Sequence, residues 1–269
     1  MAKMMRRYKA GLVQIRQNHK TDGAIDPVRG CIGCELRDQC YAKTMAGIGR
    51  TEFFQPVVQT LDERKLTRQL RSYRHDWIRI GCTGDPSLAW ATTARVVELC
   101  AATNVRPVVV TKVHERVPGN FLAILAGLAQ VQVSVSGLED ARQRVRRLGT
   151  VERLTAAGGD VVLRLVSGAW RDGSPQAAEQ DRLVSWANQR GLPILDTPLR
   201  VFRTTAAWDL LDQAKYRRHV SPISGQPGCR YCAGLLIDQA FPCYSTCSPT
   251  ATRHDPGCPH QCATRRGIA

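Results

Sequence analysis

The stretch "WIRIGCTGDPS" at residues 77–87 joins a short apolar run to a glycine-rich polar turn. The run at 77–82 is apolar and β-branched, which is typical of a buried strand. Gly81 and Gly84 allow a ligand to approach the backbone closely, and Asp85 adds a carboxylate beside them. The stretch therefore predicts a strand whose carboxyl end carries polar groups that can contact a ligand.

Runs of the same kind recur along the chain, with starts roughly 25–32 residues apart, which is the size of a strand–helix–strand unit. We expect "AGLVQI" (10–15) to be the first strand, which gives about six strands in all. Alternating strands and helices indicate an α/β fold with a parallel sheet, built as a partial (β/α)6-type barrel or as an open doubly wound sheet. The other predicted strands are 105–112, 131–137, 160–168 and 192–197, and the predicted helices are 88–103, 120–129, 139–148 and 175–191.

The chain of 269 residues is long enough for one large domain and an appendage. We assign residues 1–222 to the barrel-like domain. Residues 223–269 are rich in Pro, Gly, Ser and Cys and cannot bury much of a core, so a metal or cluster is expected to staple this C-terminal extension.

Eleven cysteines occur in a chain that shows no secretory signal and no run of eighteen apolar residues. We therefore expect a cytoplasmic protein without a membrane span. A reducing compartment favours metal ligation or catalysis over disulfides.

Three of the cysteines, Cys31, Cys34 and Cys40, are spaced C-x2-C-x5-C after the first predicted strand. Three thiolates could hold three irons of a four-iron, four-sulfur (4Fe-4S) cluster and leave the fourth iron open. The alternative is a structural zinc ion completed by Cys82 or by a histidine. The spacing alone does not separate the two.

A second cysteine set lies in the extension, with the spacing C-x2-C-x10-C-x3-C-x10-C-x3-C. Its regular pairing indicates metal ligation, either a second iron–sulfur cluster or zinc. His254 and His260 could complete a zinc site, although we expect both to be solvent-exposed. The six cysteines are Cys229, Cys232, Cys243, Cys247, Cys258 and Cys262.

Polar residues gather where the predicted strands end. Together they could hold a zwitterion, with oxygens for an ammonium group and Lys112 or Arg164 for a carboxylate. Taken singly, each is also explained as a strand-end polar group that is paired inside the protein. Cys82 could return a hydrogen atom to a product radical, but a small buried residue is the simpler explanation. The candidates are Gly84, Asp85, Thr111, Lys112, Ser134, Ser136 and Arg164.

The formal net charge is +15, and basic residues concentrate at 1–20, 64–79 and 142–147. Charge of this size favours contact with a polyanion, so nucleic acid is an expected partner. A solvated arginine-rich surface is the alternative.

A cysteine loop after the first strand of such a barrel resembles the radical S-adenosylmethionine superfamily. The order and spacing of "IRIGCTGDP", "VRPVVVTK" and "VQVSVSGLED" are similar to its spore photoproduct lyase-like branch. The likeness spans residues 25–200 or so. The usual superfamily spacing is C-x3-C-x2-C with an aromatic residue before the last cysteine, whereas here Tyr41 follows the last cysteine.

The resemblance implies a 4Fe-4S cluster on Cys31, Cys34 and Cys40, with S-adenosylmethionine at its open iron. It places the Gly-Asp-Pro turn near the cofactor amine, Lys112 near its carboxylate, and Ser134 near its carboxylate or ribose. It also implies a reductase or a flavodoxin-type electron donor.

The function expected from the sequence is radical chemistry on a nucleic acid or nucleotide. The alternatives are a peptide- or protein-modifying radical enzyme with an auxiliary cluster, and a non-catalytic zinc or iron–sulfur protein that binds nucleic acid.

Overall fold

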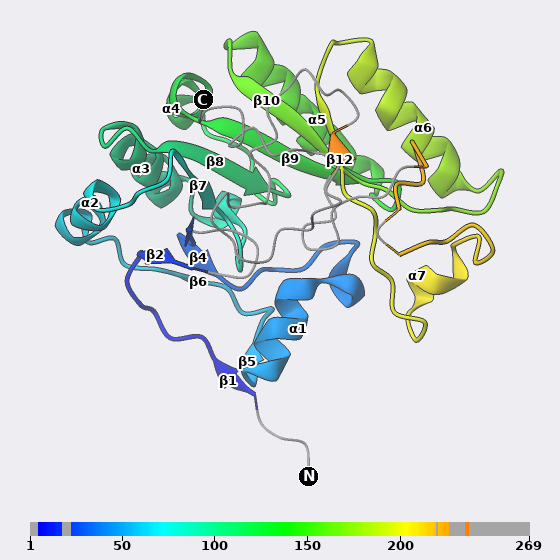
Figure 1. Cartoon of the computed structure of the whole chain (residues 1–269), viewed down its shortest axis with the longest axis horizontal. Coiled ribbons are helices and arrows are strands. Elements are labelled where there is room, and N and C mark those ends of the chain that lie inside the picture. The colour runs from blue at the N-terminus through cyan, green and yellow to red at the C-terminus, as the bar shows by residue number, and fades with distance from the viewer. Residues whose placement is uncertain (1–4, 18–22, 219, 226–234, 237–269) are drawn as a thin grey trace.

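The computed structural model describes residues 5–17, 23–218, 220–225 and 235–236 (Figure 1). Its centre is a sheet of eight strands in the order β12-β11-β10-β9-β8-β7-β3-β2. The inner strands are β3 (Ala24–Ile25), β7 (Trp77–Ile80), β8 (Arg106–Thr111), β9 (Gln130–Ser136), β10 (Asp160–Val166) and β11 (Ile194–Asp196).

Each neighbouring pair of these inner strands is parallel. Only the two edges, β2 (Ile15–Arg16) and β12 (Leu235–Leu236), pair antiparallel. The parallel strands follow the chain without reversal, whereas a doubly wound sheet reverses its order at a switch point. The α/β fold with a mostly parallel sheet is therefore confirmed for the described residues, and its strand order is consistent with a partial barrel.

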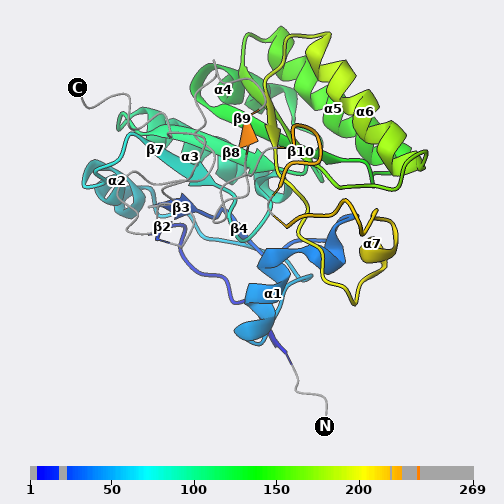
Figure 2. The same ribbon diagram turned by 45° about the vertical axis from the view of Figure 1, so that its right-hand side comes forward.

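Helices line the outer side of the sheet, and in both views α1 and α7 lie on the side opposite α4 and α5 (Figures 1 and 2). The main helices are α2 (Glu63–Arg71), α3 (Trp90–Ala101), α4 (Gly119–Leu128), α5 (Ala141–Ala156) and α6 (Pro175–Asn188). The shorter elements are α1 (Tyr41–Ile48), α7 (Ala206–Asp209), β1 (Arg6–Arg7), β4 (Val28–Arg29), β5 (Thr51–Glu52), β6 (Val57–Val58) and the 3-10 turns η1 (Arg37–Gln39) and η2 (Pro86–Ala89).

The period of two along β9 explains why the sheet has an apolar and a polar side. Val131, Val133 and Val135 belong to the main core, which also holds Leu148 and Val151 of α5. The alternate residues of β9 are Gln130, Gln132, Ser134 and Ser136, all buried on the other face. The inner side of the sheet therefore carries the polar groups that the sequence placed near the strand ends.

The predicted first strand at 10–15 is wrong. In this region only Ile15–Arg16 forms a strand, and it runs antiparallel at the edge of the sheet. The first parallel strand is β3, Ala24–Ile25. Two residues are too few to show a strand period, and β3 is held in place by its neighbours β2 and β7.

The expected domain boundary at 222/223 stays a prediction, because most of 223–269 lies outside the described residues. Within the residues that the structure covers, none of the helices combines the length and apolar character that a membrane crossing needs.

Asp196 at the end of β11 makes the stability of the fold depend on pH. It is fully buried, and burial raises the pKa of its carboxyl to about 6 although the Ser167 and Ser221 hydroxyls oppose the shift. The folded-state pKa lies above the unfolded value, so the stabilising effect of the protonated group is lost as pH rises from about 4 to 6.

Asp196→Asn should abolish this part of the pH dependence, which amounts to about 2–3 kcal/mol for a shift of this size. Urea unfolding at pH 4.5–7.5 would measure it, with the exposed Asp209→Asn as control. A wild-type pH profile that persists in the Asp196→Asn variant would contradict this assignment.

Candidate functional site

The cysteine loop lies against the end of β7. Gly30 forms a parallel bridge with Gly84 and donates its N–H to Thr83 O at 3.3 Å. The Asp26 carboxylate accepts hydrogen bonds from Cys82 N at 2.6 Å and from Thr83 N at 2.9 Å. A methyl group at position 84 would lie 2.1 Å from the Val28 carbonyl oxygen. Gly84 therefore serves the close packing of two loops.

Cys31, Cys34 and Cys40 are free and partly buried on this loop. Cys31 and Cys40 pack against a small apolar cluster around Phe53, and Cys31 N donates to Phe53 O at 2.9 Å. The conformation at Gly33, with φ +89°, turns the chain between the first two cysteines. Backbone N–H groups of Gly33 and Leu36 donate to the sulfurs of Cys31 and Cys34.

The first two thiols are held protonated by their surroundings. Burial raises the pKa of Cys31 to about 12, and the carboxylate of Asp85 adds to the shift. Burial also raises the pKa of Cys34 to about 11, although the Lys112 ammonium opposes it. Binding a metal or cluster here would release these protons, since the thiolate is the ligand.

Glu35, directly after Cys34, connects the loop to the sheet. Its carboxylate accepts a hydrogen bond from Lys112 Nζ at 2.5 Å and from Ser136 Oγ at 3.0 Å. Arg147 of α5 reaches the same carboxylate with two nitrogens, at 3.2 and 3.3 Å. Burial alone would raise the pKa of Glu35, but Lys112 and Arg147 outweigh it and hold the pKa well below its usual range.

Arg147 is also paired with Glu139, a second buried carboxylate. Its Nε donates to Lys112 O at 2.6 Å, so the guanidinium spans the ends of β8 and β9. Burial raises the pKa of Glu139 although Lys112 and Arg147 oppose the shift. We call Glu35, Lys112, Ser136, Glu139 and Arg147 the buried ion cluster.

Asp85 and Thr111 form a structural joint beside this cluster. The Asp85 carboxylate accepts from Ser87 N and Oγ, from Thr111 Oγ1 at 2.7 Å and from Lys112 N at 2.6 Å. Four internal donors satisfy the carboxylate, which also caps η2. Asp85 and Thr111 therefore fix the turn after β7 to the end of β8.

Ser134 and Arg164 lie one level deeper on the inner face, opposite each other in the β9–β10 register. Arg164 donates from Nη1 to Gln132 Oε1 at 3.1 Å. The Ser134 side chain is buried, with 6% of the residue exposed. Ser136, in contrast, belongs to the buried ion cluster.

The chain leaves β8 through a strained residue. Val113 has φ +48°, which a β-branched side chain adopts only when its surroundings impose it. The next residue, His114, lies with Nε2 3.2 Å from Cys31 Sγ and 3.8 Å from Asp85 Oδ2. Burial lowers the pKa of His114, so its ring is neutral near pH 7.

Cys82 is buried at the end of β7, beside Tyr41 from the start of α1. The Tyr41 hydroxyl donates to the Cys82 carbonyl and lies 3.7 Å from the Cys82 sulfur. Burial raises the pKa of Tyr41, so the phenol stays protonated. The two side chains form a direct contact between the cysteine loop and the sheet.

The structure thus brings Cys31, Cys34, Asp85, Thr111 and Lys112 to one end of the sheet. In the parts of the chain that are described, no three His, Cys, Asp or Glu side chains are grouped closely enough to ligate one metal ion. The C-terminal set lies outside the described residues, and so do both histidines discussed with it. These are Cys229, Cys232, Cys243, Cys247, Cys258, Cys262, His254 and His260.

Sequence reasoning missed Glu35, His114, Glu139 and Arg147 as site residues. In the sequence Arg147 belongs to the basic run at 142–147, for which a solvated surface is one explanation, yet its side chain is fully buried. A signal existed, because Arg147 lies four residues before Val151 and seven before Leu154, on one helix face with two core residues. Glu35 gave no local signal, since its partners are distant in sequence.

No family model matches the chain, and no curated protein matches it. Among solved structures it is similar to SuiB of Streptococcus suis bound to S-adenosylmethionine, with 13% identity and a TM-score of 0.48 over 73% of this chain and 44% of that chain. Another SuiB structure gives 14% identity and 0.40 over 53% and 33%. SuiB with its precursor peptide SuiA gives 15% and 0.39 over 51% and 32%. The match therefore spans less than half the length of each SuiB chain.

Gly84→Ala should destabilise the protein by about 1–3 kcal/mol, the usual cost of overpacking, because its new methyl group would meet backbone atoms. The matched control is Gly149→Ala in α5, where a methyl group meets nothing within 4 Å. That change should be neutral or stabilise the helix by up to about 1 kcal/mol. Thermal unfolding measures both, and equal midpoints would contradict the close packing of the two loops.

Arg147→Met should cost about 3–5 kcal/mol, because two buried carboxylates would lose one of the two cations that they share and keep only Lys112. The control is Arg142→Met on the same helix, where the side chain is exposed and the expected change is within about 0.5 kcal/mol. Urea unfolding at pH 7 gives both values. A loss in Arg147→Met no larger than the small change expected of the control would contradict the role of Arg147 in the buried ion cluster.

Proposed function

We propose that the chain is a radical S-adenosylmethionine enzyme, built as a partial (β/α)6 barrel with a Cys-rich, metal-stapled extension. Cys31, Cys34 and Cys40 would hold a 4Fe-4S cluster. The observation that carries the proposal is the position of the cysteine loop against the carboxyl ends of parallel strands, joined to Lys112 through Glu35. In α/β sheets with parallel strands, reactants bind at these ends.

The donor set fits such a cluster. The loop offers three free thiols with no disulfide, and two of them accept backbone N–H hydrogen bonds, which tune iron–sulfur clusters. A cluster distributes its cysteines over several irons, so they need not converge on one point as single-ion ligands do. Three cysteines leave the fourth iron for an exchangeable ligand.

When bound, the cluster would supply the electron that splits a carbon–sulfur bond of S-adenosylmethionine into methionine and a 5′-deoxyadenosyl radical, and that radical would remove a hydrogen atom from the substrate. The protein orients the reactants. Lys112 would attract the cofactor carboxylate, since its ammonium has three N–H donors and Glu35 takes one of them. The Ser134 hydroxyl would bind the carboxylate or the ribose, and Arg164 lies opposite it.

Most of the other predicted site residues would hold the binding groups in place. Backbone carbonyls around Gly84 would receive the ammonium group, because the Asp85 carboxylate is already satisfied by four donors. Thr111 and Ser136 hold Asp85 and Glu35 in place. Cys82 would return a hydrogen atom from its thiol to a product radical and would itself be left as a thiyl radical; its sulfur lies 3.7 Å from the Tyr41 hydroxyl.

The proposed substrate is a nucleic acid or nucleotide, supported by the net charge of +15. A flavodoxin-type protein or a reductase would deliver the electron. If the C-terminal cysteines hold an auxiliary cluster, a peptide or protein substrate becomes the alternative.

A zinc protein without catalytic activity is the second candidate function. It is favoured by one observation, the 3.2 Å separation of His114 Nε2 and Cys31 Sγ, which brings two types of zinc ligand together. A Cys3His site would also need Cys34 and Cys40 to move toward this pair, because no third ligand is grouped with it in the described residues. Such a protein would bind nucleic acid through its basic surface and would not cleave S-adenosylmethionine.

The test is anaerobic reconstitution with iron and sulfide, followed by metal analysis and an assay for 5′-deoxyadenosine with dithionite and S-adenosylmethionine. Cys31→Ala, Cys34→Ala and Cys40→Ala should each lose both the cluster absorbance and the product. Cys100→Ala, which removes a buried cysteine of α3 away from the loop, should retain both. Bound zinc without a cluster or deoxyadenosine would overturn the proposal in favour of the zinc protein.

Lys112→Met should keep its iron and lose about 10–100-fold in cofactor affinity, the effect of one charge-assisted hydrogen bond. The control is Lys215→Met, whose ammonium pairs with Asp172 and Asp212, both outside the buried ion cluster. Full product formation by Lys112→Met at low cofactor concentration would exclude Lys112 as the carboxylate partner.

A further inference from the structure

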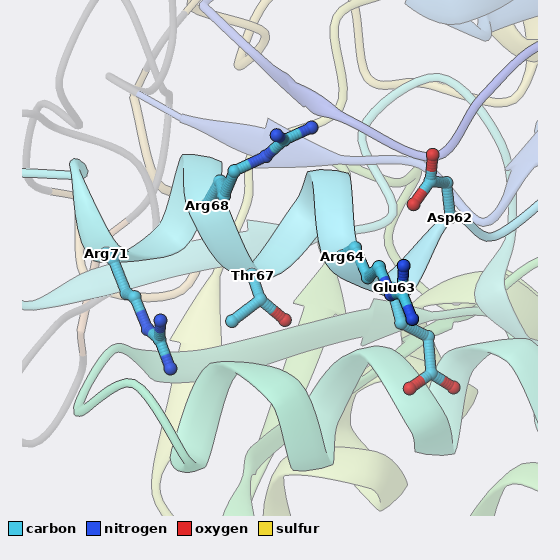
Figure 3. Close-up of a pocket in the computed structure, with 6 residues that line it drawn as sticks. All are labelled: Asp62, Glu63, Arg64, Thr67, Arg68 and Arg71. Atoms are coloured by element: carbon cyan, nitrogen blue, oxygen red, sulfur yellow. The ribbon is translucent and has the colours of Figure 1, made fainter.

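The outer side of α2 carries a row of arginines with no role in the site. Arg64, Arg68 and Arg71 are exposed and follow the helix at positions i, i+4 and i+7. In Figure 3 the side chain of Arg68 leaves one flank of α2, whereas those of Thr67 and Arg71 leave the other flank. These residues line an open hollow of about 620 Å³ together with two acids, Asp62 and Glu63. We call the three arginines the α2 arginine row.

The two nearby acids, Asp62 and Glu63, form hydrogen bonds with other residues and do not pair with the arginines of the row. Glu63 binds Arg95 of α3 at 2.8 and 2.6 Å, and Asp62 caps the helix by accepting from Lys65 N at 3.0 Å. Among the described residues, no salt bridge involves any arginine of the row. Three neighbouring cations without acidic partners therefore face solvent.

Further cations extend the surface. Gln69 of α2 accepts a hydrogen bond from Ile15 N at 3.1 Å, which places β2 beside the helix. The next residue of β2, Arg16, is exposed, and Arg74 follows α2 and is exposed as well. The basic surface thus covers the helix and the adjoining edge of the sheet.

From these contacts we infer that the α2 arginine row binds the phosphate backbone of a nucleic acid. From Arg64 to Arg71 the helix rises about 10 Å, which corresponds to about three base-pair steps measured along the axis of a duplex. Arginine suits this contact, since its planar guanidinium binds phosphate oxygens in pairs. Backbone contacts of this kind position a nucleic acid without reading its sequence.

The composition of α2 favours a nucleic acid over a membrane or an acidic protein. Its two leucines, Leu66 and Leu70, are buried in the core, so no apolar side chain of the helix is available for insertion into lipid. A protein interface would also need an apolar or aromatic centre, which the exposed face of α2 lacks. A polyanion needs only the cations.

The experiment measures binding of fluorescent 24-mer single-stranded and duplex DNA by anisotropy from 50 to 200 mM salt, at fixed pH. The variant R64Q/R68Q/R71Q should bind at least about tenfold more weakly, and its log–log salt slope should be shallower by about 2–3 units, one for each lost phosphate contact. The matched control, R142Q/R171Q/R190Q, removes three exposed arginines distant in sequence from α2 and should keep the wild-type slope.

Equal losses in the two triple variants would overturn the inference, because binding would then follow net charge alone. A row variant that loses binding to phosphatidylserine vesicles but keeps its DNA binding would also overturn it, in favour of a membrane surface. Circular dichroism and thermal unfolding confirm that both variants fold. Deoxyadenosine formation should be unchanged in the row variant, so this inference and the proposed function can fail separately.

Discussion

The carboxylate of Glu35 fixes the cysteine loop to the ends of β8 and β9 and to α5. Its partners come from three separate elements, namely Lys112 after β8, Ser136 at the end of β9 and Arg147 in α5. A buried carboxylate without cations costs several kcal/mol, so Glu35 can occupy this position only when all three elements are assembled. Cys34 is the preceding residue, and its position therefore depends on the completed sheet rather than on the loop alone.

The end of β8 holds the other half of this arrangement. Val113 keeps its positive φ because its side chain is fully buried and its N–H donates to Thr111 Oγ1 at 2.8 Å. The turn that results places Lys112 against Glu35 and His114 against Cys31. The strained backbone at Val113, which costs about 1–3 kcal/mol, therefore lies where Lys112 and His114 both contact the cysteine loop.

The long strands were predictable because their apolar runs are continuous, and Lys112 was predictable because it ends such a run. The strand β3 was not, since two residues carry no period. Asp85 was expected to face a ligand, yet the sequence Asp85-Pro86-Ser87 is also a helix-start signal, and the structure uses it as one. Glu35 could not be assigned from local pattern, because its contact with Lys112 joins residues 77 positions apart.

Two basic runs that look alike in the sequence differ in the fold, because the arginines of one are paired with carboxylates and those of the other are exposed. In the run of α5, Arg147 is neutralised by Glu35 and Glu139, and Arg144 pairs with Glu179. In the run of α2, the arginines lie opposite Leu66 and Leu70 and point away from the core. The face on which each arginine lies relative to the core leucines and valines decides between these two outcomes. The formal net charge of +15 counts buried and paired arginines of α5 together with exposed arginines of α2. Of these two groups, the arginines of α2 are the ones that a binding partner can reach. The same residue type stabilises the candidate site from inside on one helix and presents a cationic surface on another.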